Sequence, residues 1–207
     1  TPWRGTSPLS VDINGRVIDD RFFNLSHHPT MARIGEQVTG GPVRYLVDGI
    51  LVKSVHPNPG SDQTNWHRDQ GVGPACLFET TSSLYTIWVA LKETPARSGT
   101  MRFVPSRFLT SEVLELADRA PLEDTYQEFQ RRGIISAEVD YEAGDATLHL
   151  TYALHSAPPN RGAEARWGFY MTYFPAGATY SGYYIPWIPD HMKPGSAFDS
   201  TRFAIIT

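Results

Sequence analysis

The strongest constraint on the fold of this chain is the way glycine and proline divide it into short apolar runs. The 207 residues contain 17 glycines and 16 prolines, which are scattered along the chain and do not gather into a linker. The runs between them are rich in β-branched and aromatic residues, a pattern typical of strands joined by turns. No internal repeat or low-complexity tract breaks this pattern. We therefore expect one β-rich domain over residues 1–207.

Six segments carry the strand pattern, and one region between them is helical in character. The apolar spacing of residues 111–120 predicts a helix. A second helix is predicted over residues 121–132, with Pro121 in its first turn and Gly133 after its basic end. Short strands around one helical insertion, at about residues 107–132, favour an antiparallel sandwich or barrel. The predicted strands are 44–55, 84–91, 101–104, 134–139, 146–150 and 166–174.

Charge, hydropathy and cysteine content narrow the partners and the compartment. The net charge of −4 gives no basic stripe of the kind that nucleic acid requires, so no nucleic-acid partner is expected. No run of roughly eighteen apolar residues is present, so no membrane span is expected. Cys76 is the only cysteine, which excludes an intramolecular disulfide and fits a reducing, cytoplasmic location. The many aromatic residues predict a large core or a pocket for flat, apolar surfaces.

The first candidate for chemistry is a His-x-Asp motif formed by His67 and Asp69. Residues two apart on a strand point to the same face, so both side chains can converge on one metal ion. Two imidazoles and one carboxylate form the facial triad of non-haem iron oxygenases, which leaves three coordination positions open. The chain has seven His and 22 acidic residues, so on the order of one such motif is expected by chance. A distant third ligand is therefore needed.

His155 is the candidate for that third ligand. It follows a predicted strand that begins after Gly144-Asp145, and it precedes a turn rich in Pro and Gly. If the turn is a hairpin centred between Asn160 and Arg161, residue 155 lies opposite residue 166, and their side chains share a face. Arg166 would then place a planar, permanent charge near the metal, suited to a carboxylate of a diacid. Arg161 is the weaker candidate, because a solvated arginine is usual in a turn.

Three segments of the chain carry a family resemblance. They are residues 66–71, with the His-x-Asp motif; residues 85–106, with an apolar strand, a Ser-Gly turn and Val104-Pro105; and residues 144–166, from Gly-Asp through His155 to Arg166. In order and spacing they resemble the phytanoyl-CoA dioxygenase family of Fe(II)- and 2-oxoglutarate-dependent oxygenases. The resemblance implies a double-stranded β-helix, a cupin-like jelly roll, with the helical insertion outside the barrel core.

The resemblance also implies the cofactors and the roles of individual residues. His67, Asp69 and His155 would bind Fe(II), and Arg166 would pair with the far carboxylate of the cosubstrate 2-oxoglutarate. The family's reaction consumes O2 and releases succinate and CO2, most often with hydroxylation of the substrate. Trp88 and Thr64 fall where family members line the cosubstrate pocket, although Trp88 is also interpretable as a core aromatic.

The chain departs from the family pattern in two places, and it keeps one informative residue. Only 66 residues precede His67, so we expect that an N-terminal helical region is lacking. Ser106-Arg107-Phe108 follows Val104-Pro105 where the family has Gly-Ser-His, a change expected to affect a turn and not the metal. Related halogenating enzymes have a small residue in place of the carboxylate. Because Asp69 is present, oxygenation is favoured over halogenation.

Several other residues have less specific interpretations. His149 is interpreted as a pocket-lining or hydrogen-bonded core histidine rather than a metal ligand. The aromatic C-terminal stretch around Tyr180 and Trp187 is either a flap over the substrate entrance or packing across the outer sheet. The remaining histidines are expected on the surface or in loops, namely His27, His28, His56 and His191.

The predicted substrate is a small, moderately apolar molecule such as a secondary metabolite, because the chain is rich in aromatic residues. Two alternatives stay open. One is a cupin-like metalloenzyme that does not use 2-oxoglutarate, and the other is a non-catalytic jelly-roll module that binds a ligand such as a carbohydrate. Arg166 separates the first alternative from the favoured interpretation, since only 2-oxoglutarate chemistry requires it.

Overall fold

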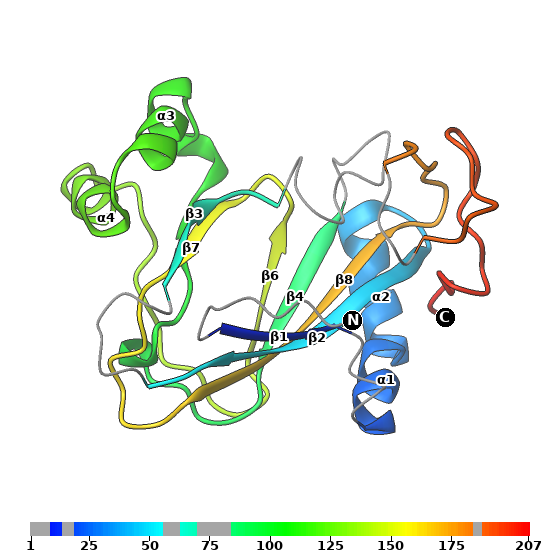
Figure 1. The fold of residues 1–207 in the computed structure, drawn as a ribbon, viewed down its shortest axis with the longest axis horizontal. Coiled ribbons are helices and arrows are strands. Elements are labelled where there is room, and N and C mark those ends of the chain that lie inside the picture. Colours follow the sequence, from blue (N-terminus) through cyan, green and yellow to red (C-terminus); the bar gives the residue numbers. More distant parts are fainter. Residues whose placement is uncertain (1–8, 14–18, 56–62, 70–83, 184–187) are drawn as a thin grey trace.

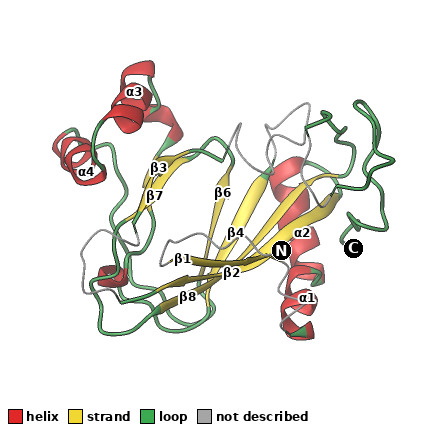
Figure 2. Cartoon of the chain, viewed as in Figure 1, coloured by secondary structure: helices red, strands yellow, loops and turns green. Residues whose placement is uncertain are grey.

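Two antiparallel sheets face one another in the computed structural model, with helices on their outer sides (Figures 1 and 2). The structure describes residues 9–13, 19–55, 63–69, 84–183 and 188–207. Several residues named above therefore lie outside the described residues: His56, Cys76 and Trp187. The described elements fix the arrangement of both sheets and of the face between them.

The larger sheet has five strands in the order β1-β2-β8-β4-β6, and the smaller has three in the order β3-β7-β5. Consecutive strands of the chain often lie in different sheets, so the chain repeatedly crosses between the two layers. This crossing defines the double-stranded β-helix, and it confirms the predicted fold class. The strands are β1 Leu9–Ile13, β2 Val43–Lys53, β3 Thr64–His67, β4 Tyr85–Ala90, β5 Arg102–Val104, β6 Ala146–Leu150, β7 Leu154–Ala157 and β8 Arg166–Pro175.

The two faces of the larger sheet differ in chemistry because side chains alternate along each strand. On β8, Phe169, Met171 and Tyr173 are fully buried on the outer face. They pack in one apolar cluster with residues of α1 (Asp20–Ser26) and α2 (Pro29–Thr39), which cover this face. The alternating positions, from Arg166 to Thr172, face the smaller sheet. The polar face thus lies inside the barrel.

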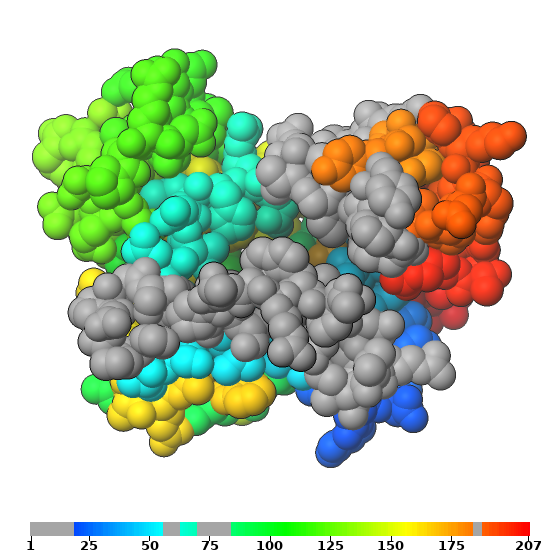
Figure 3. Space-filling view, viewed as in Figure 1, coloured from blue at the N-terminus to red at the C-terminus, as the bar shows by residue number. Residues whose placement is uncertain are grey.

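The smaller sheet turns its outer face to the helical insertion. Trp66, Val104 and Leu154, one from each strand, pack with Val113 and Phe129 of the insertion. The insertion contains η4 (Ser106–Phe108), α3 (Ser111–Arg119) and α4 (Leu122–Arg131), which confirms both predicted helices. The helical insertion and the C-terminal segment lie on opposite sides of the molecule (Figure 3). No helix in the described part of the chain is long and apolar enough to cross a membrane.

The C-terminal segment packs against the start of β2. Tyr180 is 4% exposed and belongs to an apolar cluster with Phe174, Phe198 and Phe203. Its hydroxyl donates a hydrogen bond to the backbone oxygen of Tyr183. These contacts support packing across the sheet for Tyr180.

Three features differ from the sequence prediction. Strand β1 (Leu9–Ile13) is not among the predicted strands. Residues 134–139 form no strand; Ser136 donates one backbone hydrogen bond to Phe103, and the segment leaves the edge of β5 again. Ile134 and Ile135 instead pack against the insertion, whereas Val139 is exposed. Helices α1 and α2 were not predicted. Their end signals are present, with Asp19 capping α1, Pro29 opening α2 and a left-handed Gly40 closing it.

Candidate metal centre

His67 and His155 are directly opposed in the pairing of β3 with β7. Their ring centroids are 4.1 Å apart, and His155 is also opposite Phe103 of β5. The neighbouring residues Trp66 and Leu154 point outward to the helical insertion. Alternation along both strands therefore directs the two imidazoles into the barrel.

Asp69 completes a three-residue group just beyond the end of β3. Its Oδ1 atom is 3.6 Å from Nε2 of His67. One ligand atom from each of His67, Asp69 and His155 can be chosen so that all three atoms lie within 4.8 Å of one another. The structure thus brings together the three residues that the sequence singled out for the metal.

The two histidine rings are oriented by backbone carbonyls. Nδ1 of His67 is 2.8 Å from the oxygen of Asn65, and Nδ1 of His155 is 3.0 Å from that of Ala153. In both cases the carbonyl accepts the Nδ1 proton, which leaves the lone pair on Nε2. Metal-binding histidines are commonly fixed by such a second hydrogen bond. Both rings therefore present a donor nitrogen to the space between them.

Electrostatics keep these groups in the protonation states that a metal requires. Burial lowers the pKa of His155 to about 3, and the nearby His67 and His149 act in the same direction. Burial alone would raise the pKa of Asp69, but His149, His155 and His67 outweigh it and hold that pKa below its ordinary value. At neutral pH His155 is thus a neutral imidazole and Asp69 a carboxylate. This nitrogen–nitrogen–oxygen donor set fits Fe(II).

His149 of β6 stands beside this group. It is buried, its Nε2 atom is 3.5 Å from Oδ2 of Asp69, and its ring is 4.6 Å from that of His155. His149 therefore lines the candidate site, in agreement with its prediction as a pocket-lining histidine.

The predicted hairpin between His155 and Arg166 is wrong. His155 lies in the smaller sheet, whereas Arg166 begins β8 in the larger sheet, opposite Lys53 of β2. Residues 158–165 are therefore a crossover between the layers and not a turn between paired strands. Sequence symmetry about residue 160 could not distinguish the two, because a crossover and a hairpin both need Pro, Gly and Asn.

The crossover is held in place by buried hydrogen bonds. Asn160 donates through Nδ2 to the backbone oxygens of Lys53 and Glu164, and its Oδ1 accepts from Gly162 N–H. The buried ammonium of Lys53 donates to the backbone oxygens of Ala157 and Pro158. These bonds tie the end of β7, which carries His155, and the crossover to β2, whose Lys53 lies opposite Arg166.

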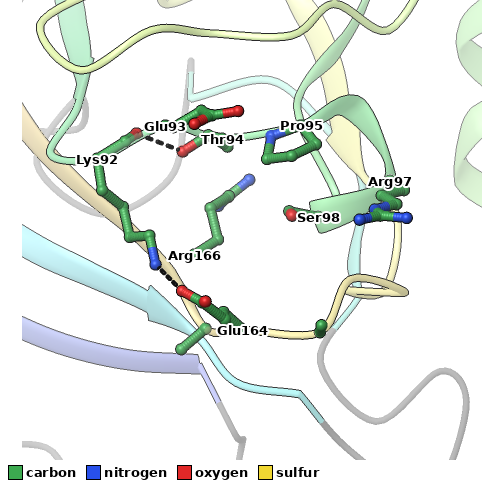
Figure 4. Close-up of a pocket in the computed structure, with 10 residues that line it drawn as sticks. Lys92, Glu93, Thr94, Pro95, Arg97, Ser98, Glu164 and Arg166 are labelled. Atoms are coloured by element: carbon green, nitrogen blue, oxygen red, sulfur yellow. Dashed lines mark hydrogen bonds and ion pairs between the residues drawn. The ribbon is translucent and has the colours of Figure 1, made fainter.

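Arg166 is buried at the inner face and lines a cavity of about 200 Å³ (Figure 4). Its guanidinium donates to the backbone oxygen of Gly99 and lies 5.2 Å from the ring centroid of Trp88. Lys92 and Glu164 form an ion pair at the side of this cavity. His67, Asp69 and His155 do not line this cavity, which therefore lies on the Arg166 side of the barrel interior.

Trp88 has features of a core residue and of a residue that lines the cosubstrate pocket. It is 2% exposed and packs edge-on against Tyr141, as a core residue does. Its Nε1 atom is nevertheless buried without a hydrogen-bond partner in the described part of the chain. The indole lies against Gly168, where an added Cβ would come within 2.2 Å of Nε1. Sequence reasoning missed Gly168, although a glycine inside a strand is itself a sign of close approach.

The other candidates are placed less centrally. Thr64 is half-buried and lies opposite Ala157, two residues along β7 from His155. Arg161 is exposed, in contrast to Arg166. Among the described surface histidines, His27 and His28 cap the ends of α1 and α2.

Comparison with known proteins identifies the class. The family model for phytanoyl-CoA dioxygenase (PhyH) matches residues 6–168, which is more than half of the chain. The chain therefore belongs to the phytanoyl-CoA dioxygenase family. It is accordingly a non-haem iron enzyme of the class that uses Fe(II), 2-oxoglutarate and O2. A comparison with curated proteins found no match.

Solved structures share the fold over most of the chain. The 2-oxoglutarate-dependent epimerase SnoN of nogalamycin biosynthesis is 22% identical with a TM-score of 0.72, covering 100% of this chain and 81% of SnoN. The carbocyclase SnoK of the same biosynthesis is 23% identical, with the same TM-score and coverage. EctD from S. alaskensis is 15% identical with a TM-score of 0.64, covering 89% of this chain and 61% of EctD. At these identities the likeness shows the fold.

Proposed function

We propose that His67, Asp69 and His155 hold Fe(II) and that the enzyme hydroxylates a small, moderately apolar molecule with release of succinate and CO2. The observation that carries this proposal is the convergence of one ligand atom from each of these residues within 4.8 Å. The family supplies the reaction class. The described residues supply a donor set that fits the ion.

Each end of the barrel has a separate task. At one end, the two imidazoles and the carboxylate bind the metal, and their backbone hydrogen bonds fix the direction of the lone pairs. At the other end, the Arg166 guanidinium binds the far carboxylate of 2-oxoglutarate, and Trp88 Nε1 offers a further buried donor. When bound, Fe(II) supplies the redox chemistry that couples oxidative decarboxylation of 2-oxoglutarate to substrate oxidation.

The inner surface near the metal centre favours a partly apolar substrate. Phe103 stacks on His155 with ring centroids 5.9 Å apart, and Tyr170 faces the same interior from β8. Burial raises the pKa of Tyr170, so it remains a neutral phenol that can donate a hydrogen bond. SnoN and SnoK act in nogalamycin biosynthesis, which supports a secondary metabolite as the substrate class.

The second candidate function is epimerisation or ring closure of the substrate in place of hydroxylation. SnoN is an epimerase and SnoK a carbocyclase, and both share this fold. Epimerisation or ring closure begins, like hydroxylation, with oxidation at a positioned C–H bond. The product therefore depends on how the pocket holds the substrate.

The test is succinate release by the purified chain with Fe(II), 2-oxoglutarate, O2 and a panel of small apolar molecules. We expect a low basal rate that a substrate stimulates. Asp69→Ala should abolish this rate, and Arg166→Ala should strongly reduce it at a 2-oxoglutarate concentration that saturates the wild type. The matched control is Arg161→Ala, which changes an exposed arginine five residues earlier and should leave the rate unchanged. Full activity of Arg166→Ala would contradict the use of 2-oxoglutarate. Mass analysis of the product separates hydroxylation from ring closure or epimerisation.

A further inference from the structure

The two carboxylate oxygens of Asp69 have different histidine neighbours. Oδ1 is 3.6 Å from Nε2 of His67, on the side of the proposed metal ligands. Oδ2 is 3.5 Å from Nε2 of His149, which reaches the carboxylate from β6 in the other sheet. The side chain of His149 is 6% exposed, and that of Asp69 is 32% exposed.

We propose that His149 is a positioning residue: it donates its Nε2 proton to Oδ2 of Asp69 and so keeps the carboxylate bound to the metal through Oδ1 alone. The inference rests on the proposed metal centre and extends it by one residue. A carboxylate that can rotate freely can also bind a metal through both oxygens. Two-oxygen binding would occupy a position that the cosubstrate or O2 requires.

The hydrogen-bond partners of the Nδ1 atoms divide the three histidines into two kinds. In His67 and His155, a backbone carbonyl accepts the Nδ1 proton, so Nε2 carries a lone pair for the metal. In His149, Nδ1 is buried and has no hydrogen-bond partner in the described part of the chain. A proton on that atom would be a buried, unsatisfied donor, which costs roughly 1–3 kcal/mol.

The favoured tautomer of His149 therefore carries its proton on Nε2, where Asp69 Oδ2 accepts it. In that tautomer Nε2 has no lone pair to give to a metal. The same geometry that makes His149 a donor to the carboxylate thus excludes it from the ligand set. Residues that bond to a metal ligand in this way typically change metal affinity by about 10–100-fold when they are replaced.

The test compares Co(II) binding to the metal-free protein across three variants. His149→Phe removes the donor, whereas His149→Gln keeps an N–H at a similar reach. The matched control is His191→Phe, because His191 lies at the same 3.5 Å from Asp199 but is exposed at the surface. We expect affinity to fall about 10–100-fold in His149→Phe. We expect His149→Gln to recover most of that loss and His191→Phe to bind as the wild type does.

A second measurement needs no variant and separates a positioning residue from a ligand. Pulsed EPR of the Cu(II)-loaded wild-type protein counts the imidazoles bound to the metal. Two imidazoles support the proposal, and three would overturn it by making His149 a ligand. Unchanged Co(II) affinity in a folded His149→Phe would also overturn it. If the wild type binds no Co(II), or His155→Ala binds it equally well, the proposed metal centre itself fails.

Discussion

His67 of β3 and His155 of β7 are paired across the smaller sheet, with their ring centroids 4.1 Å apart. The pairing explains how a motif that is weak in sequence becomes a defined site. Because strand pairing fixes both backbones, the distance between the two Nε2 atoms depends on few torsions. Asp69 lies only two residues beyond His67, so its position is tied to the same strand. The two histidines of the proposed metal centre are thus held on paired strands.

Replacement of the buried arginine should weaken binding of the diacid specifically. Arg166→Ala removes a buried charge whose proposed partner is a carboxylate, and loss of such a contact typically costs about 2–5 kcal/mol. We therefore expect the KM for 2-oxoglutarate to rise at least about 30-fold, while Fe(II) affinity changes little. Steady-state kinetics with varied 2-oxoglutarate check this. An equal rise in exposed Arg161→Ala would argue for a nonspecific effect of surface charge.

Stability of the metal-free protein should decrease as the pH falls below neutral. The pKa of His155 drops from its ordinary 6.5 to about 3 in the folded state, so protonation favours the unfolded chain. The contribution of this residue is complete above about pH 6.5 and is lost progressively as the pH falls toward 3. At pH 5 the loss amounts to about 2 kcal/mol.

Denaturant unfolding of the chelator-treated protein at pH 7 and pH 5 measures this loss. The control is His155→Gln, which keeps a neutral polar side chain that does not titrate. We expect a flatter pH dependence in this variant. A pH dependence identical to that of the wild type would show that other groups cause the loss. The pKa of Asp69 is also lowered in the folded state, so protonation of Asp69 also destabilises the fold. This effect begins at a more acidic pH than that of His155.

An alanine at position 168 should displace the Trp88 indole, which lies close to Arg166. An added Cβ would lie 2.2–2.4 Å from three atoms of the Trp88 indole, so the ring must move. We expect Gly168→Ala to destabilise the fold by about 1–3 kcal/mol and to raise the KM for 2-oxoglutarate. At Gly177 an added Cβ meets nothing within 4 Å, so Gly177→Ala is the matched control. Equal behaviour of the two variants would contradict the packing argument.

The stability of the crossover between the two sheets should depend on the side-chain amide of Asn160. Asn160→Ala leaves the backbone oxygens of Lys53 and Glu164 and the N–H of Gly162 without their side-chain partner. An unsatisfied buried group costs about 1–3 kcal/mol, so the midpoint of denaturant unfolding should fall. Asn160→Asp keeps the acceptor for Gly162 but loses both donors, and it should recover little. A midpoint like that of the wild type in both variants would show that the crossover is held by other contacts.

The sequence was sufficient where chemistry and spacing coincide. His67, Asp69 and His155 are identified from residue type, from the spacing of the His-x-Asp motif and from the family resemblance, and the structure brings them together. The strand pattern also located most strands, because β-branched runs between glycine and proline leave few alternatives. Likewise, the apolar spacing of the insertion predicted α3 and α4 within two residues of their observed ends.

What the sequence could not provide was the pairing of distant segments. Arg166 lies opposite Lys53 and not His155, because register depends on sheets that form between residues far apart in the chain. The contact of His149 with Asp69 is of the same kind, since it joins the two layers. Helices α1 and α2 are short, and their stability depends on packing against the sheet. Local pattern carries little of that information.

The proposed function requires one iron ion held by His67, Asp69 and His155, with 2-oxoglutarate bound by Arg166. An anaerobic titration of the metal-free protein with Fe(II), in the presence of 2-oxoglutarate, tests this requirement through the charge-transfer absorption of the ternary complex. We expect saturation at one iron per chain in the wild type and loss of the band in His155→Ala. A wild-type protein without the band, or a His155→Ala variant that keeps it, would rule out the proposed site.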